Sequence, residues 1–354
     1  MRGTAKIVGG GIGGLAAASA LHQAGWDVTL YEREVGLSGA GTALGMWPSA
    51  VAALDHIGTG DDVRTQGTEQ TSAEFLRADG TLIGKLDTTR LRRRTGDPVY
   101  LLSRPALLNL LYRAAQNTAT HFGHPIADIT SLQRECDVVV VADGIFSRTR
   151  AALFGDRYRA RYIGVTAWRG WIDNRPTRTM TETWGRGAKF GITPQEGGRT
   201  NWYATTVAPE GAPSPDGELA RLRELFGSWG GPVRMVLDTI AEEAILRHDL
   251  HVVPPLPTFV SGNVALIGDA AHAMPPDLGR GACETLIDAI TLARCLRESP
   301  MIDAGLHAYD RRRRRPTQRL AAAAAGASRL TRWNRNLWLR DGLLRMSLLL
   351  PPPA

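Results

Sequence analysis

The order of apolar and polar residues predicts a strand–helix–strand unit at the start of the chain. An apolar run from Ala5 to Val8 ends in glycines, small residues continue to Ala24, and Gly25 precedes a second strand-like run that ends at Tyr31. Short apolar runs bounded by turn residues are typical of buried strands, and glycine after a helical stretch is typical of a helix C-terminus. The pattern therefore predicts two parallel strands joined by a helix.

The turn between the first strand and the helix carries a G-x-G-x-x-G motif at Gly9, Gly11 and Gly14. Gly9 permits the tight turn, Gly11 lets the backbone approach a pyrophosphate, and Gly14 allows close packing of the helix on the strand. The positive end of the helix points at the phosphates. Glu32 ends the second strand, where a carboxylate accepts hydrogen bonds from ribose hydroxyls. We expect a dinucleotide site, and these residues alone do not distinguish FAD from NAD.

Two later apolar runs, 138–141 and 264–267, are also followed by carboxylates, at Asp143 and Asp269. Carboxylates at the carboxyl ends of strands lie at the mouth of an open sheet, where ligands bind. Asp269 is placed to accept a hydrogen bond from a ribityl hydroxyl. The glycine-rich loop 279–283 offers backbone amides to the electron-rich edge of an isoalloxazine ring. These later motifs favour FAD.

Residues 156–261 are rich in aromatic and β-branched residues separated by turn signals, which predicts an antiparallel sheet. Aromatic walls suit a planar organic substrate. For any single tryptophan, a place in the sheet core is the alternative. Lys189 either orients an anionic substrate or is a surface lysine on a strand. The expected pocket residues are Trp47, Trp168, Lys189, Trp202 and Pro276.

Composition narrows the classes of function. The net charge of +7 comes almost entirely from arginines that are spread along the chain, and no nucleic-acid-binding motif accompanies them. The three cysteines have neither metal-ligand spacing nor the number for a disulfide framework. No secretory signal and no run of about 18 apolar residues is present. We expect a cytoplasmic protein with no metal, no nucleic-acid partner and no membrane-spanning helix.

Together the three motifs resemble those of the single-component (group A) flavoprotein aromatic hydroxylases, which have the para-hydroxybenzoate hydroxylase fold and include salicylate and urate hydroxylases. The resemblance extends from residue 5 to about residue 320, with the motifs in the same order. It implies an α/β fold in which a Rossmann-like FAD-binding domain (1–65, 96–155 and 262–320) contains an inserted antiparallel-sheet substrate domain (66–95 and 156–261). A C-terminal helical segment, 321–354, follows.

The resemblance also assigns cofactor contacts to individual positions. Arg104 begins an R-x-x-L element whose arginine contacts FAD in the family, and Gly45 lies in a segment that passes near the flavin. Ile126 is expected to mark the strand that meets the adenine side. The complete expected set of FAD contacts is Gly9, Gly11, Gly13, Gly14, Glu32, Arg33, Gly45, Arg104, Ile126, Asp143, Asp269, Gly279, Arg280, Gly281, Ala282 and Cys283.

The chain departs from the family pattern in several places. Arg280 stands where the family usually has glutamine; it either stabilises the reduced flavin anion or is solvated. Residues 105–142 are shorter than usual by roughly one hairpin. Asn201 replaces an aromatic residue of the urate hydroxylase pattern, which argues against urate as substrate. His272 is interpreted as positional, and residues 309–316 are expected to end a helix.

The resemblance implies an FAD-dependent, NAD(P)H-consuming monooxygenase that hydroxylates or epoxidises an aromatic or polyketide-like small molecule. In the family, NADH or NADPH reduces non-covalently bound FAD, O₂ adds at the flavin C4a, and the hydroperoxide transfers one oxygen atom. The protein positions the substrate and excludes water, so we name no catalytic acid or base. The alternatives are an FAD-dependent reductase or dehydrogenase and a non-catalytic FAD-binding protein. We expect a monomer or homodimer whose C-terminal helices pack over the sheet or a partner subunit rather than on a membrane.

Overall fold

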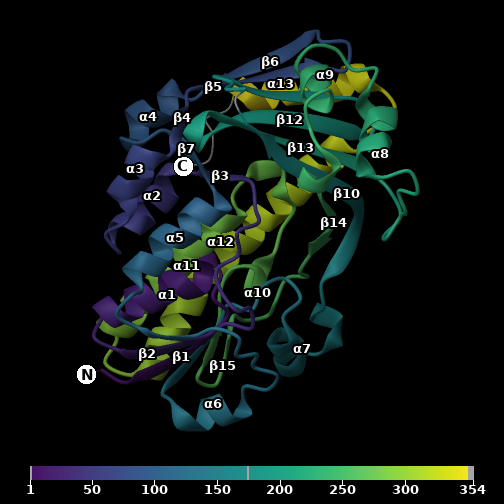
Figure 1. The fold of residues 1–354 in the computed structure, drawn as a ribbon. Coiled ribbons are helices and arrows are strands. Elements are labelled where there is room, and N and C mark those ends of the chain that lie inside the picture. Colours follow the sequence, from purple (N-terminus) through teal and green to yellow (C-terminus); the bar gives the residue numbers. More distant parts are fainter. Residues whose placement is uncertain (1, 174, 350–354) are drawn as a thin grey trace.

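The computed structural model describes residues 2–173 and 175–349, and these residues form three sheets (Figure 1). The first sheet has six strands in the order β15-β16-β9-β1-β2-β8. All neighbours in it are parallel except β15 and β16, so the carboxyl ends of β1, β2, β9 and β16 lie at one edge. The strands are β1 (Thr4–Val8), β2 (Asp27–Tyr31), β8 (Ala119–His121), β9 (Val138–Val141), β15 (Val260–Ser261) and β16 (Val264–Leu266).

Helices pack beside this sheet because small residues let them approach closely. Helix α1 (Ile12–Gln23) packs against α5 (Arg104–Ala114) and α11 (Gly281–Glu298), and α11 also contacts α2 (Pro48–Asp55). A Cβ atom on Gly13 would lie 2.8 Å from the Thr285 side chain of α11. The absence of a side chain at Gly13 therefore lets α1 and α11 pack closely. The shorter helices of this region are α3 (Gly60–Gln66), α6 (Thr130–Glu135), α7 (Arg148–Phe154), η1 (Asp156–Tyr158) and α10 (Asp269–His272).

The second sheet has seven strands in the order β14-β10-β13-β12-β11-β5-β6. One of its faces is covered by α8 (Glu218–Phe226) and α9 (Pro232–Leu237), with Phe190, Trp202, Phe226 and Val233 fully buried between them. The strands are β5 (Ser72–Arg77), β6 (Leu82–Asp87), β10 (Arg161–Ile172), β11 (Met180–Trp184), β12 (Ala188–Gln195), β13 (Arg199–Val207) and β14 (Leu246–Val252), with η2 (Glu196–Gly198) and η3 (Glu242–Ala244) in the connections.

The third sheet is small, and its three strands come from the first third of the chain. It has the order β3-β7-β4, formed by β3 (Ala43–Met46), β7 (Val99–Ser103) and β4 (Thr68–Gln70). Helix α4 (Thr89–Thr95) precedes β7. The mixed architecture of a parallel sheet, an antiparallel-rich sheet and C-terminal helices confirms the predicted fold class.

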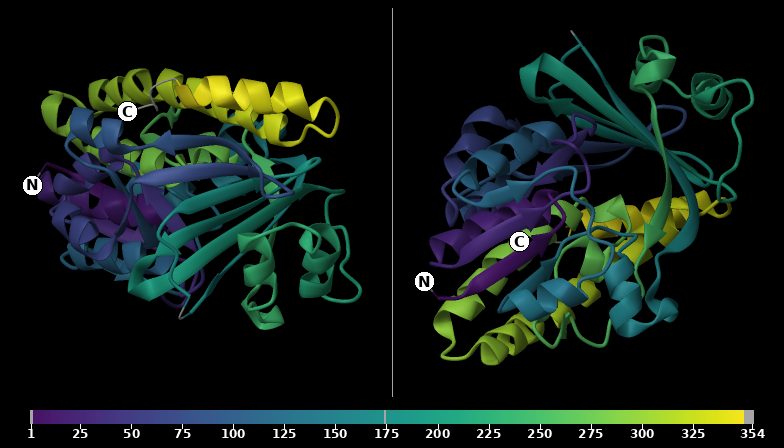
Figure 2. Two further views of the ribbon diagram at one scale, coloured as in Figure 1. Left: turned by 90° about the horizontal axis from the view of Figure 1, so that it is seen from above. Right: turned by 60° about the horizontal axis from the view of Figure 1, so that its bottom comes forward.

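A long helix connects the two large sheets. Helix α12 (Ile302–Thr331) packs against α11 at its start, and its last residue Thr331 reaches the loop that contains Asp277. Figure 2 shows α12 and α13 (Leu337–Leu349), in green to yellow, along one side of the molecule. Helix α13 packs on β6, with Leu344 buried against Ile83, while its Trp338 side chain is 76% exposed.

Two local predictions are wrong. Helix α12 does not end at residues 309–316: it continues through Pro316, because packing against the rest of the protein offsets the hydrogen bond that proline removes. Ile126 lies in no strand; the edge strand beside β2 is β8, and Ile126 packs on the core from the following loop. From residue 122 to residue 137 the only element is α6, which agrees with the shortened edge.

No helix in the described part of the chain is long and apolar enough to cross a membrane.

Candidate active site

The turn after β1 brings the predicted glycines together, and each has its own steric reason. Gly9 has φ +107°, and a Cβ atom on it would lie 2.4 Å from the Ala142 carbonyl oxygen, where β1 and β9 diverge. A Cβ on Gly14 would lie 1.7 Å from the Gly9 carbonyl oxygen. At Gly11, by contrast, no described atom beyond its chain neighbours comes within 4 Å of the Cβ position. Open space at a helix N-terminus is what a bound phosphate requires.

Glu32 follows β2 and turns its carboxylate toward the same turn. One carboxylate oxygen accepts a hydrogen bond from the Gly10 N–H, and the other accepts one from the Glu34 N–H at 2.9 Å. The neighbouring loop 121–124 is hydrogen-bonded to the backbone of Glu32. Arg33 points away, with its side chain 76% exposed and paired with Glu34. Of these two predicted contacts, the structure places Glu32 at the turn and Arg33 at the surface.

Two further carboxylates lie at the same edge of the sheet. Asp143 follows β9, and its Oδ1 is buried with no hydrogen-bond partner among the described residues; burial raises its pKa. Asp269 begins α10 after β16; the residue is exposed, while neighbouring protein atoms remove part of the hydration of its carboxylate. This partial desolvation raises the pKa of Asp269, while the charges of His272, Arg104 and Arg150 oppose the shift. A hydroxyl-bearing ligand would supply hydrogen bonds to both carboxylates.

The loop that precedes α11 leaves backbone atoms accessible to a ligand, as the sequence predicted. Gly279 takes the left-handed conformation with φ +60° and is exposed. Gly281, the first residue of α11, has no described atom within 4 Å of its Cβ position, apart from its neighbours and its own helix. Ala282 is half-buried, and Cys283 is buried with its Sγ 3.1 Å from the Gly45 carbonyl oxygen. Burial raises the pKa of Cys283 to about 11, so this thiol is structural rather than nucleophilic.

Arg104 is the first residue of α5, and its N–H donates to the Thr42 carbonyl oxygen at 3.1 Å. Its side chain lies against Gly41, where a Cβ atom would approach within 2.8 Å of Arg104 Cβ. The positive charge of Arg104 acts to lower the pKa of both Asp269 and Arg169.

Arg280 is buried rather than solvated, so the expectation of a solvated side chain is wrong. Its guanidinium donates to Glu284 at 3.0 Å and lies over the Trp47 ring, 5.3 Å from the ring centroid. The side chain therefore runs back from the loop into the protein, toward α2.

The seven-stranded sheet turns one face toward the first sheet, and we call it the inner face. It carries Lys189 on β12 and Asn201 on β13, which both contact residues outside this sheet. The Asn201 Oδ1 accepts a hydrogen bond from the Ala43 N–H at 3.2 Å. Lys189 reaches Asp277 in η4 (Pro276–Leu278), two residues before Gly279.

Trp168 and Trp202 point to the opposite face, so their prediction as pocket residues is wrong. Strand residues alternate between faces, and Trp202 lies between Asn201 and Tyr203, which belong to the inner face. Both tryptophans are buried in the core beneath α8 and α9, and the Trp168 indole donates to Glu218 at 2.6 Å. Of the other expected pocket residues, Pro276 is exposed at the start of η4.

Lys189 is buried on the inner face, so the prediction of a surface lysine is wrong. Its ammonium lies 3.0 Å from Asp277 Oδ1 and 3.3 Å from Glu182 Oε2. Burial alone would lower the pKa of Lys189, but the two carboxylates outweigh it and raise the pKa. The Trp184 indole also donates to Glu182, at 2.6 Å. The lysine thus joins the second sheet to the loop beside Gly279.

Tyr203 was missed by the sequence analysis. Its ring lies flat on β12: a Cβ atom on Gly191 would come within 2.0 Å of Tyr203 Cζ. The hydroxyl donates to Glu182, and burial together with that carboxylate raises the Tyr203 pKa well above its ordinary value. A glycine opposite a tyrosine on a neighbouring strand is a signal of such packing, but the strand register is needed to see it.

Arg169 and His248 were also missed. Arg169 on β10 pairs with Tyr203 across the strands, and so lies on the inner face. Its Nη2 is 3.0 Å from His248 Nε2, and its Nε has no hydrogen-bond partner among the described residues. Burial, then the charge of Arg104, lowers the Arg169 pKa; burial, then Arg169, lowers the His248 pKa. Arg169 therefore brings a positive charge to the inner face, whereas the charge of Lys189 is compensated by Asp277 and Glu182.

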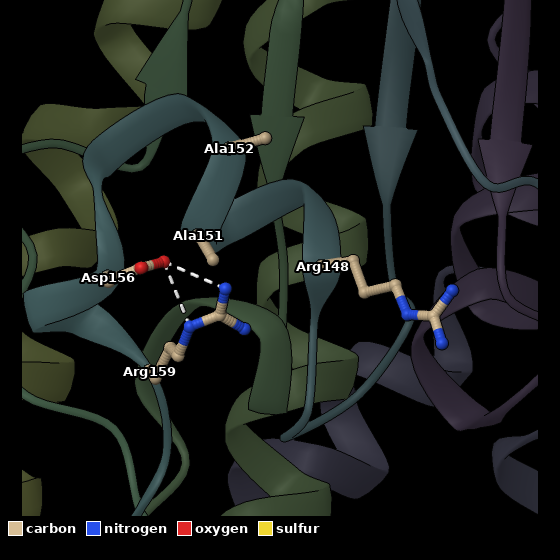
Figure 3. A pocket seen from close by; sticks show the side chains of 5 residues that line it. All are labelled: Arg148, Ala151, Ala152, Asp156 and Arg159. Carbon is tan, nitrogen blue, oxygen red and sulfur yellow. Dashed lines mark hydrogen bonds and ion pairs between the residues drawn. The ribbon is translucent and has the colours of Figure 1, made fainter.

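A pocket of about 340 Å³ lies elsewhere, between α7 and η1 (Figure 3). It is lined by Arg148, Ala151, Ala152, Asp156 and Arg159. Arg159 pairs with Asp156 within it, and Arg148 points to the other side. It contains none of the glycines described above and is separate from the candidate active site. Among the described residues, no group of three or more His, Cys, Asp or Glu side chains is arranged to hold a metal ion.

Comparison with known proteins identifies the family to which this chain belongs. The FAD binding domain family matches residues 3–324. The chain belongs to this family. Aurachin C monooxygenase/isomerase of Stigmatella aurantiaca is 31% identical, over 97% of this chain and 94% of the relative. An FAD-dependent urate hydroxylase of Klebsiella pneumoniae is 29% identical, over 87% of this chain and 85% of the relative.

A solved structure agrees with the sequence relatives. HpxO of Klebsiella pneumoniae, complexed with FAD and uric acid, superimposes with a TM-score of 0.87 at 27% identity, over 98% of this chain and 92% of that chain. The predicted family resemblance is thus confirmed, and the protein is an FAD-dependent monooxygenase rather than a reductase without oxygen transfer or a non-catalytic protein.

The residues of this monooxygenase fit FAD. The open Cβ position at Gly11 leaves room for a pyrophosphate, and that at Gly281 leaves room for a ring at the start of α11. The unpartnered Oδ1 of Asp143 and the accessible carboxylate of Asp269 are acceptors for hydroxyl groups.

Proposed function

We propose that this monooxygenase consumes NADH or NADPH to hydroxylate or epoxidise an aromatic or polyketide-like small molecule bound at the inner face. The observation that carries the proposal is the composition of that face. Tyr203, Lys189 and Arg169 lie there, whereas Trp168 and Trp202 are turned into the core on the other side. A planar ring bound there gains contact with an aromatic side chain and lies beside positive charge.

Relatives support a small-molecule substrate without fixing its identity. HpxO binds uric acid, and the Stigmatella aurantiaca relative is named for aurachin C. Asn201 replaces an aromatic residue of the urate hydroxylase pattern and is held by Ala43 and Thr193. We propose a substrate other than urate.

FAD, when bound, supplies the redox chemistry that activates O₂. Residues at the turn after β1, with Glu32, Asp143, Asp269 and the loop 279–283, would hold it. The chain's own residues then bind and orient the substrate. Ionisation of a phenol-type hydroxyl makes its ring more electron-rich, and we propose that Arg169 stabilises the negative oxygen, because its Nε has no hydrogen-bond partner among the described residues.

The pKa shifts of the inner-face side chains agree with a role in binding and orienting the substrate. The Tyr203 hydroxyl donates to Glu182 and, with its raised pKa, keeps its proton. Lys189 keeps its charge between two carboxylates. The His248 pKa is lowered, so its Nε2 is available to accept from Arg169. These groups therefore position charge, and the proton of the ionising hydroxyl is released to solvent.

The test is substrate-stimulated NAD(P)H oxidation by the FAD-loaded protein across a panel of phenols and fused-ring heterocycles. Transfer of labelled oxygen from O₂ into the product would support the proposal. NAD(P)H oxidation without labelled product for any planar aromatic compound would contradict it. Arg169→Met is expected to raise KM for a phenolic substrate about tenfold at unchanged FAD content, the magnitude of one lost charge-assisted hydrogen bond.

A further inference from the structure

Five buried side chains of alternating charge run through the FAD-binding region. Arg280 pairs with Glu284 at 3.0 Å, Glu284 with Arg313 at 2.6 Å, Arg313 with Asp288 at 2.6 Å, and Asp288 with His272 at 2.5 Å. The row begins in the loop before α11, crosses α12 at Arg313 and ends at the last residue of α10. Glu284 lies between two arginines, and Asp288 lies between Arg313 and His272, so the charges of the arginines and the carboxylates compensate one another along the row.

The first member of this row also holds an aromatic ring. The Arg280 guanidinium lies over the Trp47 indole, 5.3 Å from the ring centroid, and its Nη2 donates to Ser49 Oγ at 3.2 Å. Trp47 and Ser49 belong to the start of α2, a separate element from the loop that carries Arg280. The arginine thus bridges the loop and α2.

Trp47 is the side chain in this group that borders the candidate active site. Its indole is half-buried, and its Nε1 lies 4.0 Å from the position that a Cβ on Gly279 would take and 3.8 Å from that on Gly45. Gly279 is exposed and belongs to the loop expected to face the isoalloxazine ring.

Glu284 fixes where the guanidinium lies. Its second oxygen is held by Arg313, so the carboxylate cannot swing toward solvent without breaking a second buried ion pair. A guanidinium held on one side by this carboxylate restrains the indole on its other side, because a cation is attracted to the face of an aromatic ring. Glutamine, which the family resemblance places at position 280, carries no charge and provides no such attraction.

We propose that Arg280, clamped by Glu284, is a positioning residue that holds the Trp47 indole against the Gly279 turn and thereby determines how fully NAD(P)H oxidation is coupled to oxygen transfer. The inference rests on the proposed function. In the coupled reaction, R–H, O₂, NAD(P)H and H⁺ give R–OH, H₂O and NAD(P)⁺. In the wasteful reaction, O₂, NAD(P)H and H⁺ give H₂O₂ and NAD(P)⁺. A fixed indole beside the loop excludes water and holds the substrate, which favours the first reaction.

The position of the indole is testable without turnover. The FAD-loaded protein is labelled with 5-fluorotryptophan, and Trp47→Phe identifies the Trp47 signal among those of the nine tryptophans in the fluorine NMR spectrum. In Arg280→Gln we expect that signal to shift and narrow while the other signals keep their positions. Arg280→Lys, which keeps the charge, is expected to restore part of the shift. An unchanged Trp47 signal in Arg280→Gln would overturn the proposal.

The coupling ratio is the functional test. We expect the amount of hydroxylated product per NAD(P)H consumed to fall about fivefold in Arg280→Gln, with H₂O₂ accounting for the difference. A fivefold change corresponds to ~1 kcal/mol, which lies within the range of a partly exposed cation–π contact. The matched control is Arg294→Gln, which breaks an exposed i,i+4 pair of the same helix, with Arg294 and Glu298 3.9 Å apart. The control should leave both the Trp47 signal and the coupling ratio unchanged.

The outcomes separate this inference from the proposed function. If the Trp47 signal shifts and narrows in Arg280→Gln but the wild-type protein transfers no oxygen, the proposed function is refuted. The role of Arg280 in holding the Trp47 indole is then still supported. An active wild type whose coupling ratio is the same in Arg280→Gln and Arg294→Gln would refute the role in coupling.

Discussion

Replacing Lys189 with methionine removes the charge that joins the second sheet to the loop beside Gly279 and keeps most of the side-chain volume. In the wild type, the ammonium is 3.0 Å from Asp277 and 3.3 Å from Glu182, and the three side chains are 6–8% exposed. Without the ammonium, two buried carboxylates lose a compensating charge. Removing one partner of a buried ion pair costs about 3–5 kcal/mol, and we expect Lys189→Met to lower the free energy of unfolding by that amount.

The measurement is urea unfolding of the FAD-loaded protein. The control is Lys85→Met, which breaks a 2.6 Å pair with Glu74 on the same sheet, where the lysine side chain is 61% exposed; we expect a loss below about 1 kcal/mol. Adding Glu182→Gln to Lys189→Met removes one uncompensated charge and should recover part of the loss. A loss in Lys189→Met no greater than in Lys85→Met would refute the reasoning.

Three further predictions concern the turn, the inner face and the buried histidine. Gly11→Ala places a methyl group in open space, so unfolding should be unchanged while the Kd for FAD, measured by titrating apoprotein, rises tenfold or more, about 1.4 kcal/mol; unchanged affinity would contradict the assignment. Gly191→Ala forces the Tyr203 ring off its site and should cost about 1–3 kcal/mol in thermal unfolding; an unchanged Tm would show that the ring lies elsewhere. Asp288 raises the pKa of His272 against the opposing effect of burial, so the stabilisation by this pair is complete below pH 6.5 and is lost as pH rises through the raised value. The stability difference between wild type and His272→Asn should therefore be larger at about pH 6 than at about pH 9, and a difference that grows with pH would reverse the assignment.

The sequence predicted those parts of the site that depend on the backbone geometry of residues close together in the chain. Gly9, Gly11 and Gly14 act within one strand–turn–helix unit, so their spacing alone implied the turn and the open phosphate position found there. Asp143 and Asp269 follow buried strands, and parallel strands place their carboxyl ends at the same edge of a sheet. The family resemblance then implied the order in which these units combine.

The inner face could not be predicted from the same sequence. Alternation along β13 puts Trp202 and Tyr203 on opposite faces, but it does not say which face is turned toward the FAD-binding region. The choice is made by contacts between distant segments, such as Asn201 with Ala43, and Lys189 with Asp277. Residue type pointed to the tryptophans, whose large apolar rings serve the core equally well, as Trp168 and Trp202 do.

The sequence by itself determined the βαβ unit, the dinucleotide turn and the carboxylates at the edge of the sheet, because these follow from steric rules and strand order over short stretches of chain. The tertiary structure decided which strand face borders the flavin loop, that Lys189 and Arg280 are buried in ion pairs, and that α12 continues through Pro316. These features depend on desolvation and on charges brought together from distant segments, and a side chain's burial and partners are set only when the sheets and helices pack.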